Sequence, residues 1–95
     1  MIEIWKDIPD YEGHYQISNF GRVKSFKLNR ERILTCCKNI DGYYVFTLYL
    51  NNINKQFRLN RMLLLVFKPD DYFEGAVCNH KNGIKTDNRV ENLEW

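Results

Sequence analysis

The sequence has no long apolar run and few cysteines, and each absence excludes a class of protein. The longest apolar run, residues 62–67, is far shorter than the roughly 18 residues of a membrane-spanning helix, so we expect no membrane partner. Cys36, Cys37 and Cys78 are odd in number and form no C-x-x-C spacing, which excludes a disulfide framework and a cysteine zinc site. The start, MIEIWKDIPD, lacks a secretory leader. We therefore expect reduced thiols in a cytoplasmic protein.

The net charge of the chain is small, but its basic residues are concentrated in one segment. The 95 residues carry a net charge of +2, and residues 1–21 hold one lysine against four acidic residues. The basic segment, defined here as residues 22–38, holds six basic residues against Glu31 alone. Those six are Arg22, Lys24, Lys27, Arg30, Arg32 and Lys38. A local basic block in a near-neutral chain is the electrostatic footprint of a nucleic-acid contact, although a charge block alone fits a solvated surface equally well.

Period-two alternation near the N-terminus predicts a first antiparallel hairpin. Residues 15–18 and 22–26 alternate on either side of a turn at 19–21. The second strand of this hairpin would turn Val23 inward and its basic side chains outward. We expect this ribbon to carry the basic side chains along a groove of double-stranded DNA.

The rest of the chain predicts a second hairpin, one helix and a further strand. Residues 43–50 are β-branched and aromatic, and residues 55–60 alternate after the turn NNIN. The run 60–67 consists mainly of apolar residues without a branch at Cβ and is followed by Pro69, which predicts a short buried helix. The segment 72–80 then returns to a strand that ends at a histidine. The fold class is therefore α+β, with antiparallel hairpins and one short helix.

Two stretches resemble motifs of one enzyme family. The first, EIWKDIPDYEGHYQISNFGRVKSF, resembles the NUMOD4 DNA-binding motif of phage and intron homing endonucleases. The second, AVCNHKNGIKTDNRVENLEW, resembles the start of the HNH nuclease motif of the same enzymes. Between them, NRMLLLVF is similar to the family segment HRLVALAF, with Asn60 in place of the histidine. The resemblance implies a NUMOD4-type DNA-binding region at 1–58 and, at 59–95, the start of a ββα-metal (His-Me finger) HNH motif.

The HNH resemblance implies a metal-dependent endonuclease of homing type that nicks double-stranded DNA with Mg²⁺ or Mn²⁺. By position, His80 is the general base, since histidine titrates near neutral pH. Asn79 takes the metal-ligand position, where a carbonyl oxygen is a hard donor. Asn92 takes the central catalytic position, tying the loop and orienting the imidazole, and Asn88 supports the same loop. The resemblance also implies the cytoplasm of a phage-infected or bacterial host cell, and we expect a monomer.

Several alternatives remain at this point. A histidine in a polar loop is often only a surface residue, which is how we interpret His14, and Asn-rich loops often merely satisfy backbone amides. The family's last metal ligand lies on a helix beyond the position of Asn92, so we expect a fragment, a natural truncation or a ligand from another chain. These 95 residues would then nick DNA feebly or not at all. The alternative functions are a DNA-binding module that has lost cleavage and, third, a small α+β domain with no nucleic-acid role.

Overall fold

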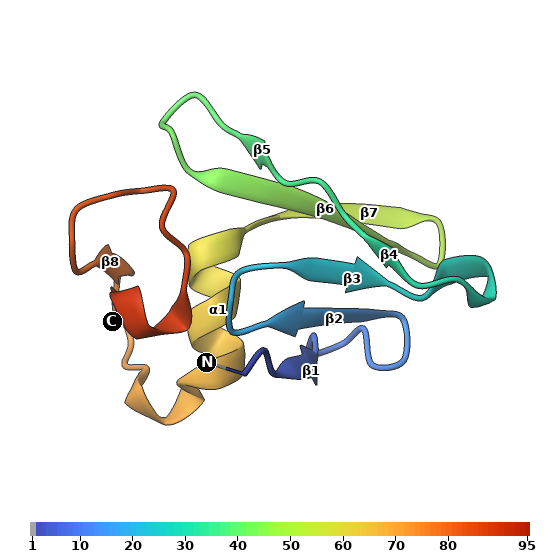
Figure 1. The fold of residues 1–95 in the computed structure, drawn as a ribbon, viewed down its shortest axis with the longest axis horizontal. Helices are drawn as coiled ribbons and strands as arrows, with labels where there is room; N and C mark the ends of the chain where they lie inside the picture. Colours follow the sequence, from blue (N-terminus) through green and yellow to red (C-terminus); the bar gives the residue numbers. More distant parts are fainter. Residues whose placement is uncertain (1) are drawn as a thin grey trace.

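The computed structural model describes residues 2–95, and within them the chain forms nine strands, one α-helix and three short 3-10 helices. Every strand pairing is antiparallel, and the strands form sheets of four, three and two strands. In Figure 1 the two larger sheets extend to one side of the α-helix, and the C-terminal hairpin lies on its other side. This arrangement confirms the predicted α+β class with antiparallel hairpins and one helix.

The four-stranded sheet contains the first predicted hairpin. Its strands are, in order, β1 (Trp5–Asp7), β2 (Tyr15–Ser18), β3 (Val23–Ser25) and β4 (Arg32–Ile33). Val23 is fully buried opposite Ile17, as the alternation predicted. The turn between β2 and β3 places Gly21 at φ +86°, a conformation that glycine adopts without steric cost. This turn becomes important below because it approaches the C-terminal loop.

The three-stranded sheet contains the second hairpin, and its turn is shorter than predicted. Its strands are β5 (Cys37–Lys38), β6 (Tyr44–Leu50) and β7 (Ile53–Arg58). Asn51 and Asn52 have φ of 53° and 63°, the left-handed conformation that a two-residue type I′ turn requires at both positions. Two asparagines therefore complete the turn, and β7 begins two residues before the strand that we predicted.

Helix α1 (Leu59–Phe67) confirms the predicted helix and begins one residue earlier. Its leucines and methionine have no branch at Cβ and favour helix, and Leu63 and Leu64 are fully buried. Lys68 and the 3-10 helix η2 (Pro69–Asp71) follow directly, because the proline cannot continue the hydrogen-bonding pattern. No helix within residues 2–95 has the length and apolar character to cross a bilayer.

The C-terminal hairpin is smaller than predicted. Strand β8 (Asn79–His80) pairs with β9 (Leu93–Glu94), which follows the 3-10 helix η3 (Val90–Asn92). We expected a strand over 72–80, but only its last two residues are extended in a sheet. The reason is the lack of a longer partner, since β9 offers only two residues for pairing.

One hydrophobic core joins all of these elements. Its fully buried members come from both larger sheets, α1, β9 and the residue after β1, and they are Ile8, Ile17, Val23, Leu48, Leu63, Leu64 and Leu93. Lys68 Nζ donates to Leu93 O over 3.0 Å, and Trp95 Nε1 donates to Lys68 O over 3.2 Å. The core therefore crosses the boundary at 58/59 that we predicted between two regions, and that division stays a prediction.

Candidate functional site

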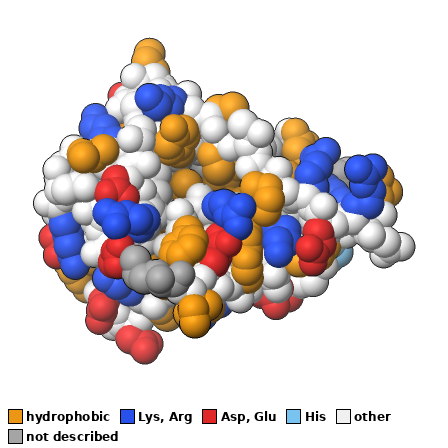
Figure 2. Space-filling view, in the orientation of Figure 1, with side chains coloured by type: hydrophobic (Ala, Val, Ile, Leu, Met, Phe, Trp, Pro, Cys, Tyr) orange, Lys and Arg blue, Asp and Glu red, His pale blue; other side chains and the backbone are white. Residues whose placement is uncertain are grey.

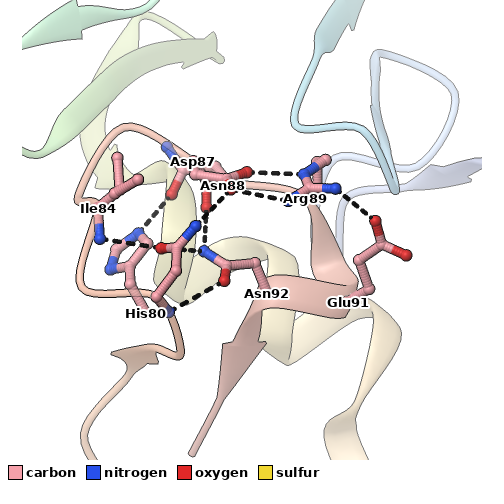
Figure 3. A network of polar contacts seen from close by, with 8 residues as sticks. His80, Ile84, Asp87, Asn88, Arg89, Glu91 and Asn92 are labelled. Carbon is pink, nitrogen blue, oxygen red and sulfur yellow. Dashed lines mark hydrogen bonds and ion pairs between the residues drawn. The ribbon is translucent and has the colours of Figure 1, made fainter.

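The imidazole of His80 is buried at the end of β8 and held by one side chain. Its exposed fraction is 7%, and Nε2 lies 2.8 Å from Asn88 Oδ1 (Figure 3). An amide oxygen can only accept a hydrogen bond, so Nε2 carries the proton. The lone pair of the neutral ring is then on Nδ1. A histidine fixed in this tautomer can take a proton through Nδ1.

Asn92 fixes the loop rather than the ring. Its Oδ1 accepts from Asn82 N over 3.2 Å, and its Nδ2 donates to Asn82 Oδ1 over 3.0 Å and to Asp87 O over 2.9 Å. We expected Asn92 to orient the imidazole and Asn88 to support the loop. Among the described residues, the side chain bonded to the ring is that of Asn88, so this part of the expectation is corrected.

An ion pair closes the same loop, defined here as the His80 loop, residues 81–92. Arg89 donates to both carboxylate oxygens of Asp87, each over 2.8 Å, and to Glu91 Oε1 over 2.7 Å (Figure 3). The hydrogen bond from Arg89 lowers the pKa of Asp87, partial burial opposes the shift, and a bond from Asn82 adds to it. Asp87 is therefore ionised near neutral pH and holds the loop through charge-assisted hydrogen bonds.

Asn79 lies beside a carboxylate that we did not predict. Asn79 is exposed, and its Nδ2 donates to Glu94 Oε1 over 2.9 Å across the β8–β9 pair. The amide oxygen of Asn79 and the carboxylate of Glu94 are hard oxygen donors of the kind that Mg²⁺ prefers. In the described part of the chain, no three His, Cys, Asp or Glu side chains gather as a metal-binding group. The strand register alone could have indicated Glu94.

Two basic side chains that we did not assign lie against Tyr43, an aromatic neighbour of His80. The Tyr43 ring centroid is 6.1 Å from that of His80. The Arg58 guanidinium and the Lys85 ammonium lie 4.8 and 4.9 Å from the same Tyr43 ring. Lys85 also donates to Asp41 O over 2.9 Å, which joins the His80 loop to the β5–β6 turn. These cations lie outside the basic segment, so local charge density gave no signal for them.

Arg22 and Lys24 lie on the outer face of the first hairpin, as predicted, but both have partners within the chain. Arg22 pairs with Glu3 and lies over the ring of Trp5, 5.4 Å from its centroid. Lys24 Nζ is 4.1 Å from the same ring centroid, and only 17% of the Lys24 side chain is exposed. The chain before β2 therefore covers part of the face that we expected to be open.

The remaining basic side chains are more accessible. Lys27 begins the 3-10 helix η1 (Lys27–Asn29), and its Nζ lies 5.1 Å from the Tyr49 ring centroid. Arg30, Arg32 and Lys38 are exposed, and none of them has an ion-pair partner within residues 2–95. Figure 2 shows Lys and Arg side chains gathered at the end of the molecule where Figure 1 places the β3–β4 connection. Lys27 and Arg30 belong to this connection, whereas Lys38 lies apart from it in β5.

Comparison with known proteins identifies the first motif and finds HNH endonucleases among the relatives of the chain. Residues 3–49 match the NUMOD4 motif. Over 91 residues the chain is 41% identical to the DNA endonuclease I-HmuI of Bacillus phage SP01, which covers 96% of this chain and 51% of that relative. The chain carries a NUMOD4 motif and is a homologue of HNH endonucleases. An uncharacterized HNH endonuclease of Acanthamoeba polyphaga mimivirus is 44% identical over 97 residues, covering 98% of this chain and 23% of that relative.

The homology to HNH endonucleases extends to the fold. A solved structure of DNA binding and cleavage by the HNH homing endonuclease I-HmuI matches with a TM-score of 0.87 and 40% sequence identity. The match covers 97% of this chain and 51% of that chain, so the chain spans about half the length of I-HmuI. The predicted family resemblance is thereby confirmed, while the roles of His80, Asn79, Asn88 and Asn92 stay predictions.

Proposed function

We propose that the chain is the DNA-binding and general-base part of a metal-dependent HNH endonuclease of homing type that nicks double-stranded DNA. The observation that carries this proposal is the match to the I-HmuI structure over 97% of the chain at 40% identity. I-HmuI both binds and cleaves DNA, so the relative joins the two activities in one protein. Because the substrate is DNA and one relative comes from a bacteriophage, we assign the activity to the cytoplasm of a host cell.

In this proposal His80 takes a proton from the attacking water. The bond between Nε2 and Asn88 Oδ1, 2.8 Å long, keeps the proton on Nε2 and leaves Nδ1 as the base. Burial of the ring limits its motion, so Nδ1 keeps one direction relative to β8. A base of this kind typically contributes about 10²–10⁴-fold to the rate.

Asn79 and Glu94 would hold the metal, because they are paired across neighbouring strands and their side chains are in contact. When bound, Mg²⁺ or Mn²⁺ neutralises charge that develops on the phosphoryl and leaving oxygens. Two protein oxygens fit the usual Mg²⁺ site, in which one or two carboxylates combine with waters and phosphate oxygens. Asn79 is neutral, so we expect it to bind the ion more weakly than a carboxylate would at the same position.

DNA would be bound by two groups of cationic side chains, one around Tyr43 and one in the basic segment. Arg58 and Lys85 flank Tyr43 beside the imidazole and can bind phosphates next to the one that is attacked. Arg30, Arg32 and Lys38 are free to bind phosphates further along the duplex. Lys27, Arg22 and Lys24 would add contacts from the first hairpin, where their aromatic partners restrict their motion.

A second function is favoured by the small number of metal ligands. Asn79 and Glu94 give one neutral and one charged oxygen ligand, which suits weak metal binding. The alternative is therefore a DNA-binding module that recognises the duplex without cutting it. Both functions require the basic side chains that bind DNA, and only the nuclease function requires His80.

The test is a supercoiled-plasmid nicking assay with Mg²⁺ or Mn²⁺, in parallel with binding to a short duplex. The variants are His80→Ala and, as a matched control, His14→Ala, which removes an exposed histidine distant from the His80 loop in sequence. We expect weak metal-dependent nicking that His80→Ala abolishes and His14→Ala preserves, with duplex binding unchanged in both.

The outcomes separate the two functions. Nicking at an undiminished rate in His80→Ala would remove His80 as the base. Duplex binding with no nicking under any metal condition would favour the binding module over the nuclease. Failure to bind duplex DNA would overturn both.

A further inference from the structure

The turn between β2 and β3 lies directly against the residue that holds His80. A Cβ added to Gly21 would lie 2.8 Å from Asn88 O and 3.3 Å from Asn88 Cβ. The first distance is shorter than real Cβ contacts allow, so one of the two segments would have to move. The side-chain oxygen of the same Asn88 accepts the hydrogen bond from His80 Nε2. Two contacts therefore connect the glycine to the imidazole.

A hydrogen bond fixes the same interface two residues further along. Val90 N donates to Asn19 O over 3.0 Å, so Asn19 and Gly21 of one turn touch both ends of the segment 88–90. These contacts join the four-stranded sheet to the His80 loop, although the contacting residues are 67 positions (Gly21 and Asn88) and 71 positions (Asn19 and Val90) apart in the sequence. The loop is thus seated on the turn at two points.

The turn itself is held rigidly. Gly21 N donates to Ser18 O over 2.9 Å, and the buried Ser18 hydroxyl accepts from Phe20 N and Arg22 N over 3.2 and 3.3 Å. Asn19 accepts from Ile4 N through its Oδ1 over 2.7 Å, which ties the N-terminal arm to the turn. Because hydrogen bonds hold the β2–β3 turn in place, the turn can determine the position of the segment 88–90 that packs against it.

We propose that Gly21 is a positioning residue for the nuclease base: its missing side chain lets the β2–β3 turn seat Asn88, which fixes the His80 imidazole with Nδ1 free. The four-stranded sheet, which lies within the NUMOD4 match, then has a second role besides DNA contact, because its β2–β3 turn completes the site around His80. Arg22, a predicted DNA contact, follows Gly21 directly. A duplex bound by Arg22 would therefore contact the same turn. This inference rests on the proposed role of His80.

The test is Gly21→Ala with Gly13→Ala as a matched control. Both glycines have positive φ, +86° and +80°, so both substitutions carry the same backbone strain. Only Gly21 faces Asn88, whereas a Cβ at Gly13 would meet nothing within 4 Å. The readout is the pair of ¹⁵N shifts of the His80 ring in the free protein, which report the tautomer without any activity. Asn88→Ala supplies the shifts of a ring that has lost its partner.

We expect Gly21→Ala to move the His80 shifts toward those of Asn88→Ala, and Gly13→Ala to leave them unchanged. Both substitutions should lower the thermal midpoint. His80 shifts in Gly21→Ala that match those of Gly13→Ala would overturn the inference.

A second variant covers the case in which Gly21→Ala does not fold. Val90→Pro removes the N–H from which Asn19 O accepts a hydrogen bond and leaves Gly21 unchanged. Val90 is the first residue of η3, where proline is tolerated, and Arg89 before it is already extended at φ −72°, ψ 137°. We expect the ¹⁵N shifts of the His80 ring to change in the same direction by a smaller amount. Unchanged shifts would count against the proposal that the β2–β3 turn positions Asn88. A shifted ring in a protein that never nicks DNA would leave the inference intact and count only against the nuclease function.

Discussion

The His80 loop and the basic segment are both short, polar and irregular, yet they are held in different ways. In the His80 loop, Asn82, Asp87 and Asn92 bond to one another, and Asn88 bonds to the imidazole. In the basic segment, Arg30, Arg32 and Lys38 extend from the surface with no ion-pair partner in the described chain.

This difference separates two kinds of functional surface. Reaction chemistry needs one geometry before substrate arrives, so the residues around a base are fixed by hydrogen bonds within the protein. Phosphate binding tolerates variation in side-chain position, since the attraction acts over several ångströms. The basic side chains of a phosphate-binding surface can therefore remain solvent-exposed in the free protein and become ordered when the duplex binds.

The largest effect should come from breaking the hydrogen bonds of the His80 loop. Asn92→Ala removes three hydrogen bonds from a buried amide. At about 1 kcal/mol for each bond, the free energy of unfolding should fall by about 2–3 kcal/mol in urea denaturation. Asn88→Ala, which removes one bond to His80, is the control and should cost about 1 kcal/mol. A larger loss in Asn88→Ala would reverse the roles that we assign to the two asparagines.

The next effect should separate free cations from engaged ones within the basic segment. Arg30→Ala and Arg32→Ala should each lower the salt slope of duplex binding by roughly 0.9, the value of one phosphate contact. Lys24→Ala should lower it less, because Trp5 covers Lys24 and leaves 17% of its side chain exposed. Fluorescence anisotropy over a salt series measures the slopes. Equal slopes for all three variants would show that burial by Trp5 does not matter, and unchanged slopes would exclude this surface from the interface.

A smaller effect concerns backbone strain in the basic segment. Leu28 has φ 57° and ψ 32°, a left-handed conformation that bulky residues disfavour, and its side chain is 89% exposed. Leu28→Gly should raise the free energy of unfolding by about 1 kcal/mol, because it relieves this strain and loses no packing. Leu28→Ala keeps the Cβ and should bring no gain. A stabilising effect of the alanine variant would show that the exposed leucine, and not its backbone, was unfavourable.

The smallest effect should be the pH response of Asp87. Its lowered pKa means that the ion pair with Arg89 stabilises the fold above the ordinary carboxyl pKa of about 3.9 and is lost as pH falls through the lower folded value. The difference in urea midpoint between the protein and Asp87→Asn should be constant above about pH 5 and shrink in acid. A difference that grows as pH falls would show that Asp87 does not depend on its ionised form.

Much of the fold was predictable because it depends on local patterns. Alternation around Gly21 and the apolar run before Pro69 each specify one element from neighbouring residues alone. The strand expected over 72–80 was not so specified. A strand needs a partner of matching length, and the partner here is only Leu93–Glu94. Pairing between distant segments is a property of the folded chain, so the sequence pattern could not limit it.

The candidate site was predictable in its members more than in its contacts. His80 and its asparagines were found from their order in the chain, but the direction of each amide depends on the hairpin register. Asn92 O accepts from Lys81 N over 2.8 Å, and its side chain turns into the loop. Glu94 and Arg58 lie near the site through pairing and packing that no single stretch reveals. The covering of Lys24 by Trp5 likewise arises from a strand folded back beside its neighbour.

The shared hydrophobic core limits how this protein could be recombined with its relatives. Homing enzymes invite the exchange of DNA-binding and cutting parts between family members, with a crossover placed between the motifs. Here a crossover at 58/59 would separate Ile17 and Val23 from Leu63, Leu64 and Leu93, which pack in one core. It would also separate Gly21 from the loop that rests on it. A functional chimera would therefore have to inherit both faces of that core from one parent.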